Sequence, residues 1–122
     1  MPQMTDECAR RFGQEWVDAW NAHDLDRVLA HYADDCEFQS PFIISIANEP
    51  SGRLTGKAAI RAYWAAALEK LPDLRFELLD VLIGADCLTL HYRGHRGLVA
   101  ETCFFNGSGK VICATACYSI GL

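Results

Sequence analysis

The sequence has 122 residues, of which 51% are hydrophobic and 22% charged, and its formal net charge is −5. This length predicts one domain over residues 1–122, since compact domains cluster at roughly 100–150 residues. The acidic balance argues against nucleic-acid binding, which needs clustered Lys and Arg, and no apolar run approaches the roughly 20 residues of a membrane span. The first residues also lack the basic-then-apolar order of a signal peptide, so we expect a cytoplasmic protein without membrane association.

The N-terminal part of the chain predicts two helices. Over residues 6–21, apolar side chains recur at helical spacing, and Thr5 is placed to cap the first turn. After a short turn at residues 21–23, Asp24 is placed to cap a second helix. The apolar residues that this second helix would bury are Leu25, Val28, Leu29 and Tyr32.

The next segment predicts a strand followed by a region with two interpretations. In a strand over residues 36–42, the side chains of Cys36, Phe38 and Ser40 would share one face. Residues 43–54 combine strand-like isoleucines with loop-forming Asn, Pro and Gly. This segment could form a strand, a lid over a cavity, or part of a subunit contact.

The remaining residues predict a third helix and an antiparallel meander. The helix runs from residue 55 or 56 to about residue 71, where Pro72 ends it. Turn-forming residues separate the strands that follow, a pattern typical of hairpins. We expect these strands near residues 74–83, 86–93, 98–105 and 110–119.

This order of elements predicts an α+β fold. Three helices packed on one face of a long, curved, mainly antiparallel sheet would enclose a cone. A small molecule would bind in that cone, since ligand sites are concave and largely apolar.

The cysteines do not predict a disulfide framework, because no export signal accompanies them. We expect most of them to be small buried hydrophobic residues in reduced form. They are Cys8, Cys36, Cys87, Cys103, Cys113 and Cys117. Closely spaced Cys and His residues lie on predicted strands, where four residues span roughly 13 Å, too far for one zinc ion with bonds of about 2.3 Å. We therefore predict no metal site and no cofactor.

One carboxylate is predicted to lie on an apolar face. In the strand at 98–105, Glu101 alternates with Val99, Cys103 and Phe105, so its side chain would point into the core. Burial would raise its pKa and favour the neutral acid, which can donate a hydrogen bond to a carbonyl oxygen. Alternatively, the face is partly wet, or Glu101 pairs with an arginine across the sheet.

Several short motifs, in this order and spacing, resemble the nuclear transport factor 2-like superfamily, and within it the steroid delta-isomerase and SnoaL-like group. They are WVDAWNAHDLD at 16–26, YADD at 32–35, GKAAIR at 56–61, KLP at 70–72 and FNGSGKV at 105–111. The resemblance covers nearly the whole chain and implies a cystatin-like, cone-shaped fold.

The resemblance also implies roles for individual residues. Isomerases of this group move a proton beside a ketone, with an Asp base near the end of the first strand. A Tyr on the first helix and a protonated Asp on a late strand form the oxyanion hole. By position, the base falls on Ser40, the helix tyrosine on Trp16 and the late acid on Glu101. A supporting tyrosine is kept as Tyr32, and a second falls on Trp64.

Two hypotheses about function follow. In the first, Glu101 and Trp16 polarise an apolar carbonyl compound in an enzyme of the isomerase or polyketide-cyclase type. In the second, the chain is a non-catalytic ligand-binding or dimeric assembly module, because a serine hydroxyl at position 40 cannot act as a general base near neutral pH. The residues expected to bind the apolar ligand are Trp20, Phe38, Trp64, Val99, Cys103 and Tyr118.

Two surface features suggest partners. Relatives of this fold commonly dimerise through the outer sheet face, which predicts a homodimer here. That face would carry Thr102, Phe104, Cys113, Thr115 and Cys117. A basic cluster at Arg93, His95 and Arg96 could bind an anionic ligand or a partner, or form a solvated hairpin tip.

Overall fold

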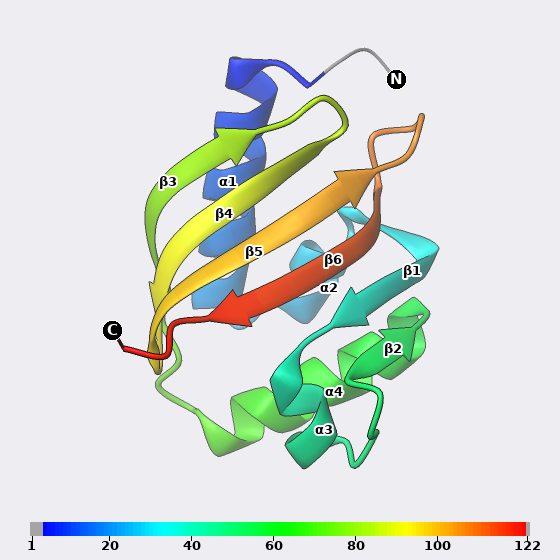
Figure 1. Cartoon of the computed structure of the whole chain (residues 1–122), viewed down its shortest axis with the longest axis vertical. Coiled ribbons are helices and arrows are strands. Elements are labelled where there is room, and N and C mark those ends of the chain that lie inside the picture. Colours follow the sequence, from blue (N-terminus) through cyan, green and yellow to red (C-terminus); the bar gives the residue numbers. More distant parts are fainter. Residues whose placement is uncertain (1–3, 122) are drawn as a thin grey trace.

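The computed structural model describes residues 4–121, which form helices and strands in the predicted α+β order. The elements are α1 (Asp6–Asn21), α2 (Leu25–Leu29), β1 (Tyr32–Gln39), α3 (Pro41–Ile46), β2 (Arg53–Thr55), α4 (Lys57–Lys70), β3 (Glu77–Ile83), β4 (Cys87–Gly94), β5 (Gly97–Phe105) and β6 (Val111–Tyr118). Three of the four helices within these residues are the predicted ones, and α3 is additional. Helices α1 and α2 lie on one face of the curved sheet, and α3 and α4 lie near one end of it (Figure 1).

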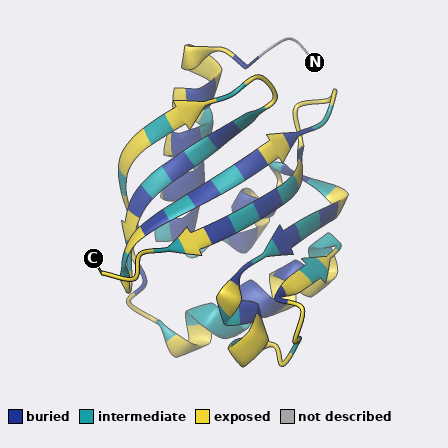
Figure 2. Cartoon of the chain, viewed as in Figure 1, coloured by how far each residue is buried: buried dark blue, intermediate teal, exposed yellow. Residues whose placement is uncertain are grey.

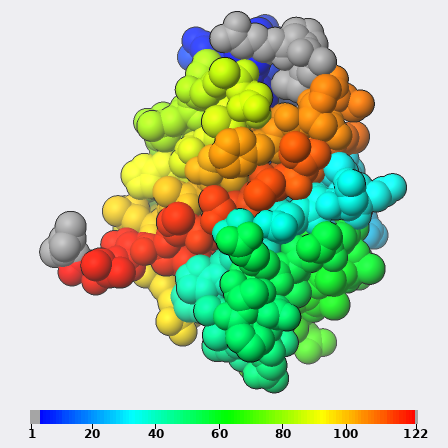
Figure 3. Space-filling view, turned by 45° about the vertical axis from the view of Figure 1, so that its right-hand side comes forward, coloured from blue at the N-terminus to red at the C-terminus, as the bar shows by residue number. Residues whose placement is uncertain are grey.

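The strands form a single six-stranded sheet in the order β2-β1-β6-β5-β4-β3. Strand β1 pairs with β6 in parallel, and the other neighbouring pairs are antiparallel. This confirms the mainly antiparallel sheet expected from the hairpin turns. In Figure 3, β6 crosses the surface as a red band between β5 and β1.

Buried and more exposed residues alternate along most of the central strands, as the colours of Figure 2 show for β4, β5 and β6. On β5, Val99, Glu101 and Cys103 point into the core, whereas Thr102 and Phe104 point outward. Each fully buried aliphatic side chain contributes roughly 1.5–3 kcal/mol to folding. The inner face of the sheet therefore supplies much of the core, and Glu101 is a polar exception within it.

Helix α1 approaches the sheet closely at Gly13. A Cβ atom at this position would lie 2.9 Å from Cγ2 of Val81 and 3.3 Å from side-chain carbons of Leu78 and Leu90. Glycine therefore permits a helix–sheet separation that a larger residue would prevent. The close contact places the C-terminal half of α1, which carries Trp16 and Trp20, over the concave face.

Residues 41–46 differ from the prediction because they form helix α3. The hydroxyl of Ser40 accepts a hydrogen bond from the backbone N–H of Phe42 at 3.2 Å, which caps the helix. Pro41 occupies the first turn, where its missing N–H leaves no hydrogen bond unmade. The strand-like isoleucines are not all buried, since Ile43 is fully buried and Ile44 is 48% exposed. The predicted strand at 36–42 accordingly ends at Gln39.

Tyr32 also differs from its predicted place. Helix α2 ends at Leu29, and Tyr32 is the first residue of β1 instead of the last buried position of the helix. Its parallel pairing with Val111 of β6 determines this position, and its ring is 1% exposed. Pairing between distant segments outweighs the local helical spacing here.

The cysteines are free in the described part of the chain, but only two of them fit the expectation of burial. Cys36 and Cys103 are buried on the inner face, whereas Cys8 and Cys117 are exposed and Cys87 and Cys113 are half-buried. No helix among residues 4–121 is long and apolar enough to cross a membrane.

Candidate functional site

The cone contains a cavity of about 410 Å³ with a largely aromatic wall. This volume falls within the range of ordinary small-molecule sites. Its aromatic side chains come from segments spread along the whole sequence and include Trp16, Trp20, Phe38, Trp64, Phe76 and Tyr118. The wall is continuous, because Trp20 packs edge-on against Trp64 at 5.0 Å and lies 5.5 Å from Phe76 between ring centroids.

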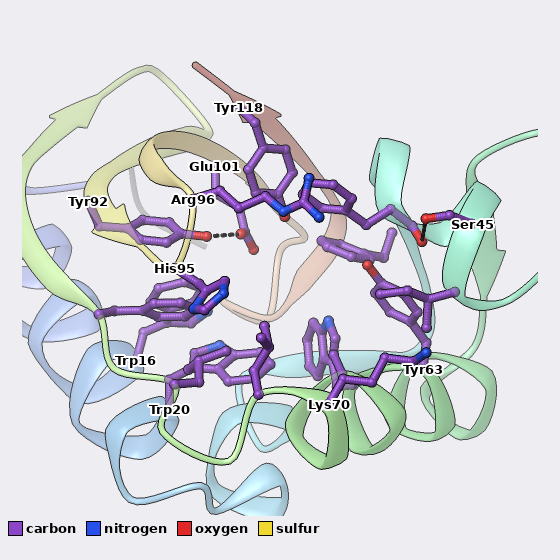
Figure 4. Close-up of a pocket in the computed structure, with 18 residues that line it drawn as sticks. Trp16, Trp20, Ser45, Tyr63, Lys70, Tyr92, His95, Arg96, Glu101 and Tyr118 are labelled. Atoms are coloured by element: carbon purple, nitrogen blue, oxygen red, sulfur yellow. Dashed lines mark hydrogen bonds between the residues drawn. The ribbon is translucent and has the colours of Figure 1, made fainter. Parts of the chain in front are cut away.

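Glu101 brings a carboxyl group into this apolar wall. The residue is 3% exposed, and its neighbours across the sheet are Leu90 and Ala116. Tyr92 donates its hydroxyl hydrogen to Oε1 of Glu101 at 2.9 Å (Figure 4). Burial raises the pKa of Glu101 to about 7, because it penalises the charged form, and the hydrogen bond from Tyr92 offsets only part of this effect. Near neutral pH the carboxyl group can therefore both donate and accept a proton.

The two indole groups of α1 play different parts. Nε1 of Trp16 donates a hydrogen bond to the hydroxyl of Tyr32 at 3.2 Å, in a fully buried pair. Trp20 is 5% exposed, and its Nε1 has no hydrogen-bond partner among the described residues. A buried N–H without a partner costs roughly 1–3 kcal/mol, a cost that an acceptor atom of a ligand would remove. Of the two indoles of α1, Trp20 is thus the one whose N–H has no partner among the described residues.

Ser40 is buried next to the cavity but does not line it. It is 3% exposed and caps α3, as described above. Burial raises the pKa of Tyr63 and of Tyr118, and hydrogen bonding with the side chain of Ser40 partly opposes this in both. Ser40 is therefore close to two tyrosines that line the cavity, although it does not line the cavity itself.

A family model of the SnoaL-like domain matches residues 14–117, which include every element from the middle of α1 to β6. The chain belongs to the SnoaL-like family. This confirms the resemblance found in the sequence motifs.

Solved structures of SnoaL-like and related proteins share the fold. A SnoaL-like protein of unknown function from Burkholderia thailandensis is 49% identical, with a TM-score of 0.92 over 96% of this chain and 98% of that one. A candidate polyketide cyclase from Sinorhizobium meliloti is 16% identical, with a TM-score of 0.69 over 88% and 94% of the two chains. A candidate isomerase of the SnoaL-like family from Agrobacterium tumefaciens is 18% identical, with a TM-score of 0.70 over the same shares. The last two likenesses concern the fold alone.

The SnoaL-like cone brings together part of the predicted site. Six of the ten predicted residues line the cavity, namely Glu101, Trp16, Trp20, Phe38, Trp64 and Tyr118. The other four, Tyr32, Ser40, Val99 and Cys103, are buried but lie outside its lining. Val99 and Cys103 flank Glu101 on the same strand face, so they share its orientation without reaching the cavity.

Sequence reasoning missed several lining residues of this SnoaL-like cavity. Phe42, Ser45 and Ile46 come from α3, whereas the sequence predicted a strand up to Phe42 and left residues 43–54 between a strand and a loop. Of the alternatives for residues 43–54, a strand forms only at the end, where β2 begins at Arg53, and a lid over the cavity stays a prediction that the placement of Ser45 and Ile46 favours. The signal that could have found α3 is the pair Ser40-Pro41, since a capping serine followed by proline typically begins a helix.

A second missed stretch, between α4 and β3, also lines the cavity through Leu74 and Phe76. The side chain of Asn21 bonds the backbone of Phe76 twice, donating to its carbonyl at 3.0 Å and accepting from its N–H at 2.7 Å. A ring nitrogen of His23 lies 2.8 Å from the carbonyl oxygen of Leu74. The family motif around residues 21–23 thus anchors one wall of the cavity to the end of α1.

Proposed function

We propose that this protein binds a small, largely apolar carbonyl compound in the cone and acts as an isomerase or polyketide-cyclase type of enzyme. Glu101 is the group that exchanges a proton with the ligand. The observation that carries the proposal is the buried carboxyl group with a pKa of about 7, held by Tyr92 inside an aromatic cavity. General acid–base groups work best when their pKa lies near the working pH.

The donors around the cavity support a carbonyl ligand. The ketone oxygen would accept a hydrogen bond from a tyrosine hydroxyl such as that of Tyr63 or Tyr118, and from the unpaired Nε1–H of Trp20 when this buried indole turns toward the ligand. Trp20 thereby takes the part that the sequence had suggested for Trp16, whose N–H is already bound to Tyr32. These donors would stabilise negative charge on the oxygen when a proton leaves the adjacent carbon.

Glu101 would then act as the general base, the role for which the sequence offered only Ser40. As a carboxylate it accepts the proton from the carbon beside the carbonyl, which gives an enolate. As a neutral acid it returns that proton to the same or another carbon of the conjugated system. Atoms and charge balance in this shuttle without a second base, and the absence of an acid at position 40 is no obstacle to it.

Hydrogen–deuterium exchange tests this proposal without knowledge of the natural substrate. The probe is 2-tetralone, a two-ring apolar ketone, and proton NMR in D₂O follows the loss of the hydrogens beside its carbonyl. We expect the wild-type protein to accelerate this exchange with an apparent pKa of about 7. Glu101→Gln should reduce the acceleration by about 10²-fold or more while ligand binding persists.

The matched control is Glu77→Gln, because that side chain is exposed and pairs with Arg93 outside the cavity. Exchange at the wild-type rate in Glu101→Gln would refute the role of Glu101. Binding of the ketone without any accelerated exchange would favour the second candidate.

The second candidate is a non-catalytic binding module that assembles as a homodimer through the outer sheet face. It is favoured by the position of Ser40, where related isomerases carry a base and where this chain has a helix cap outside the cavity lining. Phe104, on the outer face of β5, is 38% exposed and supplies an apolar contact for such a dimer. Sedimentation at micromolar concentration tests it: the wild type should be dimeric and Phe104→Lys monomeric, and a monomeric wild type would refute the dimer.

A further inference from the structure

We propose that the ligand carries a carboxylate group, which Lys70, His95 and Arg96 bind at the mouth of the cavity. The inference rests on the proposed function, because it takes the cone as the ligand site. It adds a substrate class to that proposal: an apolar keto acid, with its ketone beside Glu101 and its carboxylate near solvent.

The distribution of charge around the cavity carries the inference. The chain has 16 acidic residues against 11 Lys and Arg. The cavity lining reverses this balance, with Lys70, Arg96 and His95 against Glu101 as its single acidic residue in the described chain. The three basic side chains belong to exposed residues, whereas Glu101 is 3% exposed. The basic side chains therefore lie at the solvent end of the cavity and the carboxyl group at the buried end.

The positive charges of Lys70 and Arg96 are not neutralised by ion pairs within the described residues. Within residues 4–121, neither Lys70 nor Arg96 forms an ion pair with a carboxylate. Glu101 does not serve as their partner, since it forms no ion pair within these residues and its carboxyl group accepts a hydrogen bond from Tyr92 instead. By contrast, Arg93 in the same hairpin points to the outer side and pairs with Glu77 at 3.5 Å. The basic cluster predicted from the sequence therefore has two parts. Arg93 is paired on the outer side of the sheet, whereas Arg96 lines the cavity without a carboxylate partner among the described residues.

The guanidinium group of Arg96 is also held in place at the mouth. It lies over the ring of Phe42, with 4.7 Å from its Cζ to the ring centroid. Phe42 in turn packs edge-on against Tyr118 at 4.5 Å between centroids. A guanidinium group positioned on an aromatic ring keeps its N–H donors free at its edge, and these donors match the two oxygens of a carboxylate.

The basic groups approach the mouth from separate elements. Lys70 ends α4, whereas His95 and Arg96 come from the turn between β4 and β5, and Figure 4 shows them around different sides of the cavity. A lysine in the last turn of a helix also interacts with the helix dipole, so its presence alone would not indicate a ligand. The convergence of cationic side chains from two elements on one apolar cavity is the feature that a carboxylate ligand explains.

The test compares 4-oxo-4-phenylbutanoic acid with its methyl ester, which keeps the aryl ketone but lacks the charge. Binding is followed by quenching of tryptophan fluorescence, because all three tryptophans line the cavity. We expect the wild type to bind the acid about fivefold to tenfold more tightly than the ester at low salt. Added salt should weaken binding of the acid and leave that of the ester nearly unchanged.

The double variant Lys70→Gln/Arg96→Gln should lose this preference, and its unchanged affinity for the ester would show that the cavity is intact. The matched control Arg93→Gln removes one positive charge from the same hairpin and should keep the preference. Equal binding of acid and ester by the wild type would overturn the inference, as would a preference that survives in the double variant or disappears equally in the control. If the ester still binds in those cases, the proposed carbonyl site stands; if neither compound binds, both proposals fail.

Discussion

Replacing Glu101 by glutamine should remove a pH-dependent loss of stability from this protein. The carboxyl group has a pKa of about 7 in the folded chain, against an ordinary value of 4.5. Between these values the folded chain holds the proton and the unfolded chain releases it, so the free energy of unfolding falls as the pH rises. One pKa unit corresponds to about 1.4 kcal/mol, so the full loss above pH 7 is about 3 kcal/mol. Stability from this group is thus complete below pH 4.5 and lost by about pH 8.

Glutamine has nearly the same shape, stays neutral at every pH, and can still accept the hydrogen bond from Tyr92. Urea unfolding of both proteins between pH 4.5 and 8 measures the difference. We expect the unfolding free energy of the variant, relative to the wild type, to rise by about 3 kcal/mol across this range. His31, whose pKa is lowered chiefly by burial, is common to both proteins, so its contribution cancels in the difference.

The matched control is Glu77→Gln, whose side chain is exposed and should give a curve parallel to that of the wild type. Parallel curves for wild type and Glu101→Gln would show that the carboxyl group titrates as an ordinary one. That result would remove the physical basis for its role in proton transfer.

Three further substitutions test other parts of the structure. Tyr92→Phe removes the hydrogen bond that lowers the pKa of Glu101, so this pKa should rise further above 7. The measurement is ¹³C NMR of labelled glutamate, and a fall in the pKa would contradict the geometry. Ser40→Ala removes the cap of α3 and should lower the free energy of unfolding, measured in urea, by about 1 kcal/mol. An unchanged free energy of unfolding would show that this cap does not stabilise the fold. Gly13→Ala gains about 1 kcal/mol in helix propensity, but its Cβ would lie 2.9 Å from a methyl group of Val81. We therefore expect a lower Tm, and a higher Tm would refute the close packing.

The features that the sequence predicted correctly are those with a regular local pattern. The amphipathic spacing in residues 6–21 determines helix α1, because one face must be buried whatever it packs against. Alternation on β5 likewise placed Glu101 on the inner face, since side chains two residues apart must share a face. The alternative in which an arginine pairs with Glu101 is wrong, because Tyr92 donates the hydrogen bond to this carboxyl group.

The features that the sequence could not determine depend on contacts between distant segments. Tyr32 lies on β1 and not on a helix because of its pairing with a strand almost 80 residues later. Local spacing also could not tell which indole of α1 is free, since the answer depends on Tyr32 reaching Trp16 and not Trp20. Nor could it show that the hairpin turn would bring Arg96 to the cavity, because that follows from the curvature of the sheet.

The parallel pairing of β1 with β6 has a consequence for how the protein folds. Strand β6 lies between β1 and β5, so residues 111–118 must be inserted before the two parts of the sheet become continuous. Such long-range pairing raises contact order and slows folding. On the ribosome, a nascent chain that lacks β6 would present the unpaired edges of both β1 and β5, which are sites for misassociation.

Since β6 also contributes Tyr118 to the wall, the cavity cannot be complete before this insertion. A ligand that requires the complete cavity would therefore bind only after folding and would shift the equilibrium toward the finished sheet.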